Sequence, residues 1–381
     1  MGGETVRLDG NTLVLPGGVG VRFIRTLRLP EQGTHPLPPG LGEFPVRRVA
    51  DYVDSVPEEW AKRGGVMLPM YLREAMWLSF SATEPAALQI GVGKVCAVSG
   101  KPWSDRLGRD PQNYVVLPKQ PWLDGINSGS GTIRQFIAVP LGLGATVEGQ
   151  ITGEETHGGI QLQNFSLNDT ELARWRRAEE ERRRAEAAER VRAISYAPMP
   201  SPPPAFGAPA PGSAAPPGYG APPSAPGLGG PPLPAPGSAA PGSSARLFGQ
   251  RRPRAKTMGL GVGGTMRQEI FKDDRPLEAW SVQPSARLFV HLVTPPDWQR
   301  ITGEAAPPSP VDRKAYTAAG LPWFDYFDSD ATDLAPAEPL ANVTPVGDWL
   351  GDDHEPWQNP TPGQVHHLGD KKGKPVEDGE W

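Results

Sequence analysis

Short runs of apolar residues, separated by turn residues, recur through the first 168 residues. In residues 19–29 the apolar side chains fall on alternate positions, at Val21 and Phe23 and again at Leu27 and Leu29. A period of two residues is that of a strand with one buried face. Similar short segments follow at 66–70, 75–80, 88–98, 114–117, 133–139, 145–151 and 159–165. This rhythm predicts a mainly β fold, an antiparallel sandwich or barrel-like domain.

One long helix is predicted at 169–196, where the apolar rhythm gives way to charged residues. Asn168 or Asp169 can cap its start, because their side-chain oxygens accept hydrogen bonds from free backbone N–H groups. Glutamate and arginine recur four residues apart, as at Glu179 and Arg183, and such pairs stabilise a helix. The segment has few apolar residues to bury, so we expect the helix to be exposed to solvent.

Residues 197–256 predict a disordered linker. Up to residue 245 the sequence is almost entirely proline, alanine, glycine and serine, a composition that cannot bury enough apolar surface to fold. Two segments, Pro202-Pro203-Pro204 and Pro231-Pro232-Leu233-Pro234, favour the polyproline II conformation. Aromatic grooves bind such segments. The other interpretation is a plain tether.

The residues after the linker contain too little strand to form a core by themselves. Two β-type runs at 265–271 and 287–294 precede an aromatic segment at 316–327, and two or three strands do not make an independent fold. We therefore predict that residues 257–327 complete the sheet of the first 168, so that helix and linker are an insertion in one domain. Two separately folded domains are the alternative. Residues 328–381 predict an acidic, largely irregular tail.

Charge and cysteine content narrow the function classes. The formal net charge is −5, which gives no overall attraction to nucleic acid or to anionic membranes. A lone cysteine, Cys96, cannot form an intramolecular disulfide or a cysteine-based zinc site, and it favours a reducing compartment. The N-terminus does not have the pattern of a signal peptide, and the longest apolar run is too short to cross a bilayer. We therefore expect a cytoplasmic protein with no membrane span.

Motifs for cofactors and metals are missing or out of context. Residues 259–264 match the pattern G-x-G-x-x-G, but a strand-like segment follows them where a dinucleotide site needs a helix. They are better interpreted as a glycine-dense entry to that strand. The histidines are scattered and have no metal-ligand spacing. The sequence thus predicts no cofactor and no metal site.

Asp124 and Glu148 are the candidate catalytic carboxylates. Asp124 lies in Gln-Pro-Trp-Leu-Asp-Gly at 120–125, where it either bonds its own turn or accepts a hydrogen bond from a ligand. Glu148 lies among predicted strands, and a partly buried carboxylate is a catalytic candidate. Its other interpretation is a structural pair with Arg134. A glycosidase needs two carboxyl groups roughly 5 to 9 Å apart, a distance that the sequence does not give.

Four tryptophans are candidate contact residues, because tryptophan often anchors interfaces. They are Trp103, Trp122, Trp298 and Trp323. Asp124 and Arg134 join them as candidate binding residues.

These residues favour a non-catalytic binding or assembly protein that contacts a protein partner, or itself, through aromatic loops. One alternative is a carbohydrate-active or other hydrolytic enzyme using Asp124 and Glu148. Another is a nucleic-acid accessory protein, which the net charge disfavours. It would act through the basic residues Arg246, Arg251, Arg252, Arg254 and Lys256. Whether a small molecule binds stays open.

Several segments resemble those of a known protein family. The similar segments are Arg-Glu-Ala-Met-Trp-Leu-Ser-Phe at 73–80, together with 120–125, 134–138, 259–270 and 320–324. The family consists of functionally uncharacterised, β-rich proteins from actinomycete-type bacteria and some fungi. The similarity covers nearly all the sequence outside the linker. It implies that the parts before and after the linker belong together, and it implies no activity.

Overall fold

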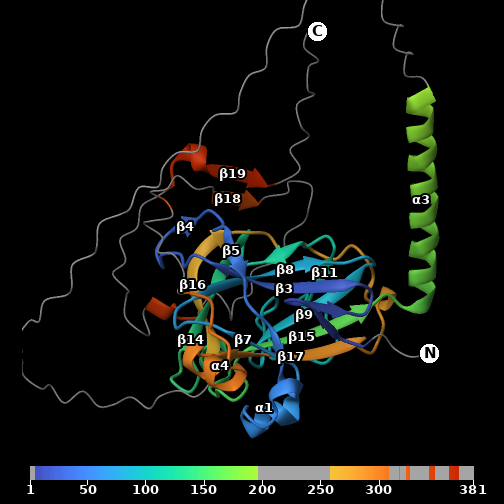
Figure 1. Ribbon diagram of the computed structural model, residues 1–381. Coiled ribbons are helices and arrows are strands. Elements are labelled where there is room, and N and C mark those ends of the chain that lie inside the picture. The colour runs from blue at the N-terminus through green and yellow to red at the C-terminus, as the bar shows by residue number, and fades with distance from the viewer. Residues whose placement is uncertain are drawn as a thin grey trace, which may run out of the picture. The chain divides into compact units, whose positions relative to one another are not determined.

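The computed structural model describes residues 5–195, 258–308, 317, 323–326, 343–347 and 360–368. These residues form mainly antiparallel β structure with few helices, which confirms the predicted fold class (Figure 1). The predicted linker and its basic cluster lie outside the described residues.

A first run of neighbouring strands combines segments within residues 7–140 with residues 258–267. Its members pair in the order β1–β2–β3–β8–β14–β16, always antiparallel. Short strands β5, β12 and β13 pair with β3, β8 and β14, and β4 runs parallel to β16. Their bounds are β1 Arg7–Asp9, β2 Thr12–Leu15, β3 Val19–Thr26, β4 Thr34–His35, β5 Gly40–Glu43, β8 Ala75–Ser81, β12 Trp122–Leu123, β13 Gly125–Gly129, β14 Thr132–Pro140 and β16 Met258–Arg267.

A second run pairs in the order β11–β9–β15–β17–β7–β6. All of its pairs are antiparallel except β17 with β7, and β10 pairs with β9. Their bounds are β6 Arg47–Arg48, β7 Val66–Pro69, β9 Ala86–Val92, β10 Val95–Cys96, β11 Val115–Leu117, β15 Ile160–Ser166 and β17 Ala286–Val293. The two runs meet where Met258 of β16 pairs with Leu292 of β17.

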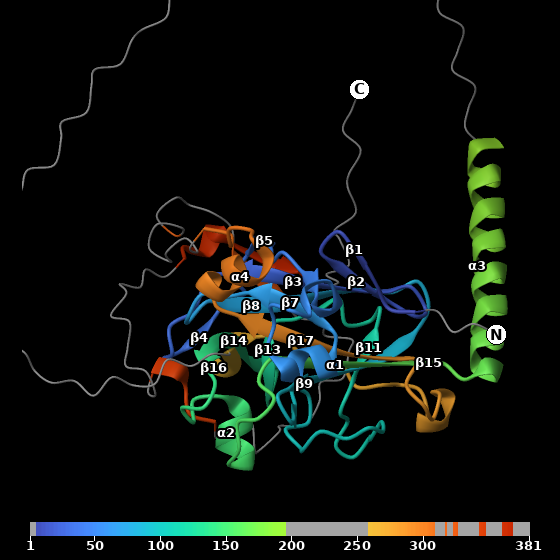
Figure 2. The same ribbon diagram turned by 60° about the horizontal axis from the view of Figure 1, so that its bottom comes forward.

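The two runs share one apolar core, and Figure 2 shows their strands from a second direction. Phe23 and Phe136 from the first run and Ile90 and Leu162 from the second belong to the same buried cluster. At about 25 cal/mol per Å² of apolar surface removed from water, this cluster is the main source of stability. The sequence period of two follows from it, because alternate residues of each strand face this core.

Strands from both sides of the predicted insertion pair directly. β14 pairs with β16 from Thr132 opposite Arg267 to Pro140 opposite Met258. The sequence predicts a strand from residue 265 with the glycines 259–264 as its entry, whereas β16 begins at Met258 and includes these glycines. One reason for the glycines is close packing: a Cβ atom on Gly264 would lie 2.1 Å from the Pro30 carbonyl oxygen.

The helices are few and sit in connections. They are α1 Glu58–Arg63, α2 Val147–Thr152, α3 Asp169–Ser195 and α4 Pro295–Thr302, with short 3-10 turns η1 Val49–Tyr52, η2 Leu277–Ala279 and η3 Pro362–Gln364. The predicted strand at 145–151 is wrong, because α2 occupies it. The Thr146 side chain accepts a hydrogen bond from the Gly149 backbone, and Gly153 ends the helix in a left-handed conformation.

The long charged helix α3 is present as predicted. The Asn168 side chain caps its start by accepting from the backbone N–H of Glu171, 2.9 Å away. Leu172 and Trp175 in its first two turns pack against a small apolar cluster that includes Trp280. Residues 181–190 are all exposed.

No helix in the described part of the chain is long and apolar enough to cross a membrane.

A second sheet has two strands and is separate from the large sheet in its hydrogen bonding. It consists of β18 Trp323–Tyr326 and β19 Val365–Leu368, which run parallel. The aromatic segment was expected to complete the large sheet. Its described strand instead pairs with a strand of the C-terminal tail, where the sequence predicts largely irregular structure.

Candidate ligand-binding pocket

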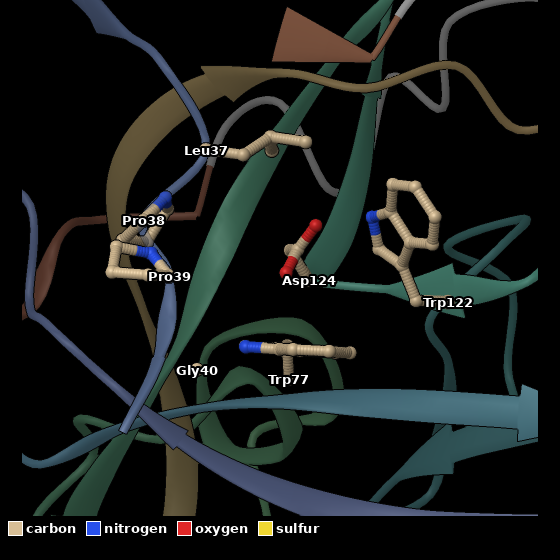
Figure 3. Close-up of a pocket in the computed structure, with 7 residues that line it drawn as sticks. All are labelled: Leu37, Pro38, Pro39, Gly40, Trp77, Trp122 and Asp124. Carbon is tan, nitrogen blue, oxygen red and sulfur yellow. The ribbon is translucent and has the colours of Figure 1, made fainter. Parts of the chain in front are cut away.

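A cavity of about 170 Å³ opens beside β8, β12 and the segment that leads into β5. Figure 3 shows Asp124 at its centre, with Trp77 and Trp122 on two sides and Pro38 and Pro39 opposite Trp122. The full lining consists of Leu37, Pro38, Pro39, Gly40, Trp77, Trp122 and Asp124. The lining is therefore largely apolar, with two indole N–H groups and one carboxyl group as its side-chain polar atoms.

Strand pairing brings these residues together. In β8 the neighbours Met76 and Leu78 are buried in the core, so Trp77 points to the opposite face of the strand. β12 pairs with β8 so that Trp122 lies opposite Ser79, two positions from Trp77. The pocket thus stands on the face of β8 that is turned away from the core.

The segment before β5 supplies the other wall. β5 pairs with β3, which places Gly40 opposite Thr26, while Trp77 lies opposite Ile24 on the other side of β3. A Cβ atom on Gly40 would lie 2.9 Å from the Ile24 side chain and 3.3 Å from the Trp77 ring. Glycine at this position therefore lets the backbone approach Trp77 and keeps the wall close to the ring.

Asp124 is the one ionisable side chain that lines the pocket. It is 3% exposed, and its carboxyl accepts a hydrogen bond of 2.9 Å from the Gln268 side-chain amide. The Gln268 carbonyl in turn accepts from the Asp124 backbone N–H at 3.0 Å. Burial raises the pKa of Asp124 to about 8, against hydrogen bonds from the Trp122 and Gln268 side chains that lower it. The carboxyl is therefore protonated and uncharged at neutral pH, and its side chain bonds Gln268 rather than its own turn.

Trp77 brings a donor whose hydrogen bond is not made. Its indole Nε1–H is buried, and within the described ranges no acceptor is in reach of it. A buried donor left unpaired costs about 1 to 3 kcal/mol. Because this atom is buried, a ligand oxygen reaches it only when the groups around it shift, and a carbonyl or hydroxyl oxygen placed against the N–H then recovers that free energy.

Glu148 has a different environment and does not line the pocket. It is completely buried, and its carboxylate accepts from the backbone N–H groups of His157 and Gly158, at 3.1 and 2.9 Å. These bonds fix the turn between α2 and β15. Among the described residues, none bonds both Glu148 and Asp124. The described hydrogen-bond partners of the two carboxyl groups are therefore separate, and Glu148 acts as an acceptor for the turn after α2.

Arg134 is also tied to the chain itself. Its guanidinium donates to the Val343 backbone carbonyl, whereas the partners of Glu148 come from residues 156–158. The hypothesis of a structural pair between Arg134 and Glu148 is not supported by these contacts. Gln135, its neighbour in β14, is the fully buried residue of the two.

The candidate tryptophans divide into three groups. Trp122 lines the pocket. Trp298 is fully buried in α4 with Val49 and Met67, so in this structure it presents no surface to a partner. Trp103 is partly exposed and lies over Gly91, where a Cβ atom would come within 2.7 Å of its ring. The Trp323 side chain lies outside the described residues.

Sequence reasoning missed Trp77 and residues 37–40 of the lining, and it missed Gln268, which bonds Asp124. Trp77 could have been found, since it is an aromatic residue on the outward phase of a strand whose inward positions are Met76, Leu78 and Phe80. The others carry no such signal.

No protein-family model matches this chain, and no curated protein or solved structure matches it. Within the described residues, no group of three or more histidine, cysteine, aspartate or glutamate side chains is placed to hold a metal ion. The function of the pocket is therefore argued from its own residues.

Proposed function

We propose that this chain is a non-catalytic binding protein that takes an uncharged segment of a macromolecular partner into the pocket of Trp77, Trp122 and Asp124. The observation that carries the proposal is the buried indole N–H of Trp77, for which none of the described residues supplies an acceptor, beside an apolar wall. Largely apolar pockets with a few placed polar groups are the usual form of a binding site. The proposed compartment is the cytoplasm, and the single buried thiol of Cys96 is consistent with it.

The chemistry of the lining defines the ligand. The two tryptophan rings and Pro38 and Pro39 favour a compact apolar group, and Trp77 requires a hydrogen-bond acceptor next to it. Because Asp124 is uncharged at neutral pH, the pocket offers no charge to attract a cation. A charged ligand would also lose its hydration there without gaining a partner. We therefore expect a neutral ligand that carries both an apolar ring or branch and a carbonyl or hydroxyl oxygen.

The hydrolytic alternative has no comparable support. Acid–base hydrolysis of a glycoside needs two carboxyl groups around one substrate, and Asp124 and Glu148 bond separate sets of residues. The basic cluster of the nucleic-acid alternative lies outside the described residues, so no contact favours it.

The test uses the full chain labelled with 5-fluorotryptophan and observed by fluorine NMR. The probe is N-acetylproline N-methylamide, which combines a small apolar ring with carbonyl acceptors. Methyl glucoside and tetramethylammonium serve as a sugar and a cation for comparison. We expect the amide to shift the Trp77 and Trp122 signals in a saturable way and the cation to leave them unchanged.

Trp77→Phe keeps the ring and removes the N–H, so it isolates the hydrogen bond. Loss of about 1 kcal/mol should weaken binding of the amide roughly fivefold, measured on the Trp122 signal. Trp103→Phe, at a tryptophan outside the pocket, is the matched control and should bind like the parent. If none of the three probes shifts Trp77 or Trp122, the pocket is not a binding site and the proposal is wrong.

A further inference from the structure

We propose that the occupant of this pocket is the proline-rich tract at residues 231–234 of a second copy of the chain, so that the protein assembles with itself. The inference rests on the proposed function and names its partner.

The shape of the pocket fits a prolyl ring. Its volume of about 170 Å³ is close to the roughly 150 Å³ of an apolar cavity that takes up benzene, a ring of similar size. Domains that bind polyproline II segments place proline rings against aromatic side chains. Here Trp77 and Trp122 provide two such faces around one cavity, and Leu37, Pro38 and Pro39 close it on the other sides (Figure 3).

The hydrogen bonding also fits. A polyproline II segment has no internal hydrogen bonds, so its carbonyl oxygens are free to accept. The Trp77 Nε1–H is buried, and none of the described residues accepts from it. Prolines in turn have no N–H to leave unpaired in an apolar site. A run of prolines can therefore supply a carbonyl acceptor to the Trp77 N–H, and its prolines bring no N–H that would be left unpaired in the apolar pocket.

The absence of charged side chains distinguishes this part of the sequence as a partner for the pocket. Residues 197–245 contain no charged side chain, whereas the helix before them and the tail at 328–381 are rich in charge. The pocket has a protonated carboxyl and otherwise apolar walls, so placing an ion in it would cost free energy. Within 197–245, Pro231-Pro232-Leu233-Pro234 combines three prolines with a leucine, which gives it the largest apolar side chain of the two polyproline II segments.

The experiment measures self-association of the full chain by sedimentation velocity over a wide range of protein concentration. The tract variant carries Pro231→Ser, Pro232→Ser and Pro234→Ser. Its matched control carries Pro202→Ser, Pro203→Ser and Pro204→Ser and so loses the same number of prolines. The pocket variant is Trp77→Phe, with Trp103→Phe as its control.

We expect the parent chain to associate as concentration rises. The tract variant should associate at least about tenfold more weakly, and Trp77→Phe about fivefold more weakly, which corresponds to one hydrogen bond. Both control variants should associate like the parent. In the fluorine spectrum, a synthetic peptide of residues 229–236 should shift the Trp122 signal of the tract variant.

Each failure has its own meaning. If the prolyl amide binds but the tract variant associates like the parent, the partner inference is wrong and the proposed function stands. If neither the amide nor the peptide shifts Trp122, both are wrong. If the tract variant changes the Trp122 signal of a chain that stays monomeric at every concentration, the tract binds within its own chain and the second-copy proposal is overturned.

Discussion

Replacing Asp124 with asparagine tests whether the pocket is uncharged at neutral pH. The carboxyl of Asp124 has a pKa of about 8 in the folded protein, against an ordinary value of 3.8, because burial disfavours the charged form. In the unfolded chain the same carboxyl ionises above about pH 4. Folding therefore requires it to take up a proton over this pH range. Its contribution to stability is complete below about pH 4 and is lost as the pH rises towards 8.

The size of the effect follows from the two pKa values. Each pH unit between them costs about 1.4 kcal/mol of stability. From about pH 5 to pH 8 the loss comes to roughly 3 to 4 kcal/mol, since the group is already half ionised in the folded state at the upper end. Asparagine does not ionise, so the variant avoids this loss. It pays a constant cost of about 1 to 3 kcal/mol instead, because one of its donors faces a donor, the Trp122 or Gln268 side chain.

The assay is urea unfolding of the parent and of Asp124→Asn at several pH values. The free energy of unfolding of the parent, relative to the variant, should fall by roughly 3 to 4 kcal/mol between about pH 5 and pH 8. Histidines titrate in both proteins and cancel in the difference. Asp54→Asn, at an exposed aspartate, is the control and should follow the parent. Parallel curves for the parent and Asp124→Asn would show that the carboxyl ionises without penalty, and the argument for a neutral ligand would fail.

Three further substitutions test the rest of the structure by chemical denaturation. Gly93→Ala should destabilise the folded protein by about 2 kcal/mol more than Gly153→Ala. Both glycines have positive φ, but a Cβ atom on Gly93 would lie 2.5 Å from the Glu148 carboxylate, whereas one on Gly153 meets nothing within 4 Å. Equal losses would contradict this packing. Glu148→Gln should lower stability by about 2 to 4 kcal/mol, because an amide donor then faces two backbone donors; a neutral result would argue against a structural role. Burial lowers the pKa of His291 to about 4, so the parent should lose roughly 2 to 3 kcal/mol as the pH falls from about 6.5 to 4. His291→Gln should lack that loss, and an unchanged acid profile would count against it.

Local patterns carried enough information for the fold class. The alternation at Val21 and Phe23 holds in β3, where both side chains are completely buried. The charged helix α3 was found because helix pairs and caps are encoded within a few residues of one another. The prediction of a strand at residues 145–151 failed because it was based on their apolar content. The caps Thr146 and Gly153, which lie at the two ends of α2, were the stronger signal.

Long-range contacts were outside the reach of such patterns. The apolar residues of 133–139 do not alternate strictly, so the sequence alone does not decide whether Arg134 or Gln135 is buried. The structure buries Gln135, whose side chain donates to the Leu27 carbonyl at 2.7 Å and accepts from the Leu29 backbone N–H at 2.9 Å. These partners lie more than a hundred positions away in the sequence, and a shift of register between β14 and β16 accompanies them.

In the pocket, too, some residues were predictable from local sequence and others depend on long-range contacts. Trp122 and Asp124 stood out because they are adjacent to a turn signal. Gln268 supports Asp124 from the end of β16, and residues 37–40 reach Trp77 through the pairing of β5 with β3. Neither of these two contacts follows from local sequence, since both depend on which strands become neighbours.

The pairing of β14 with β16 and of β15 with β17 has a consequence for the covalent chain. These ladders join residues before the insertion to residues after it, so the peptide bonds between 196 and 257 are not what keeps the two parts together. A polypeptide severed there should still purify as one particle composed of two fragments. Lengthening or shortening that stretch should also be well tolerated, because doubling a connection costs only about 0.6 kcal/mol in closure entropy.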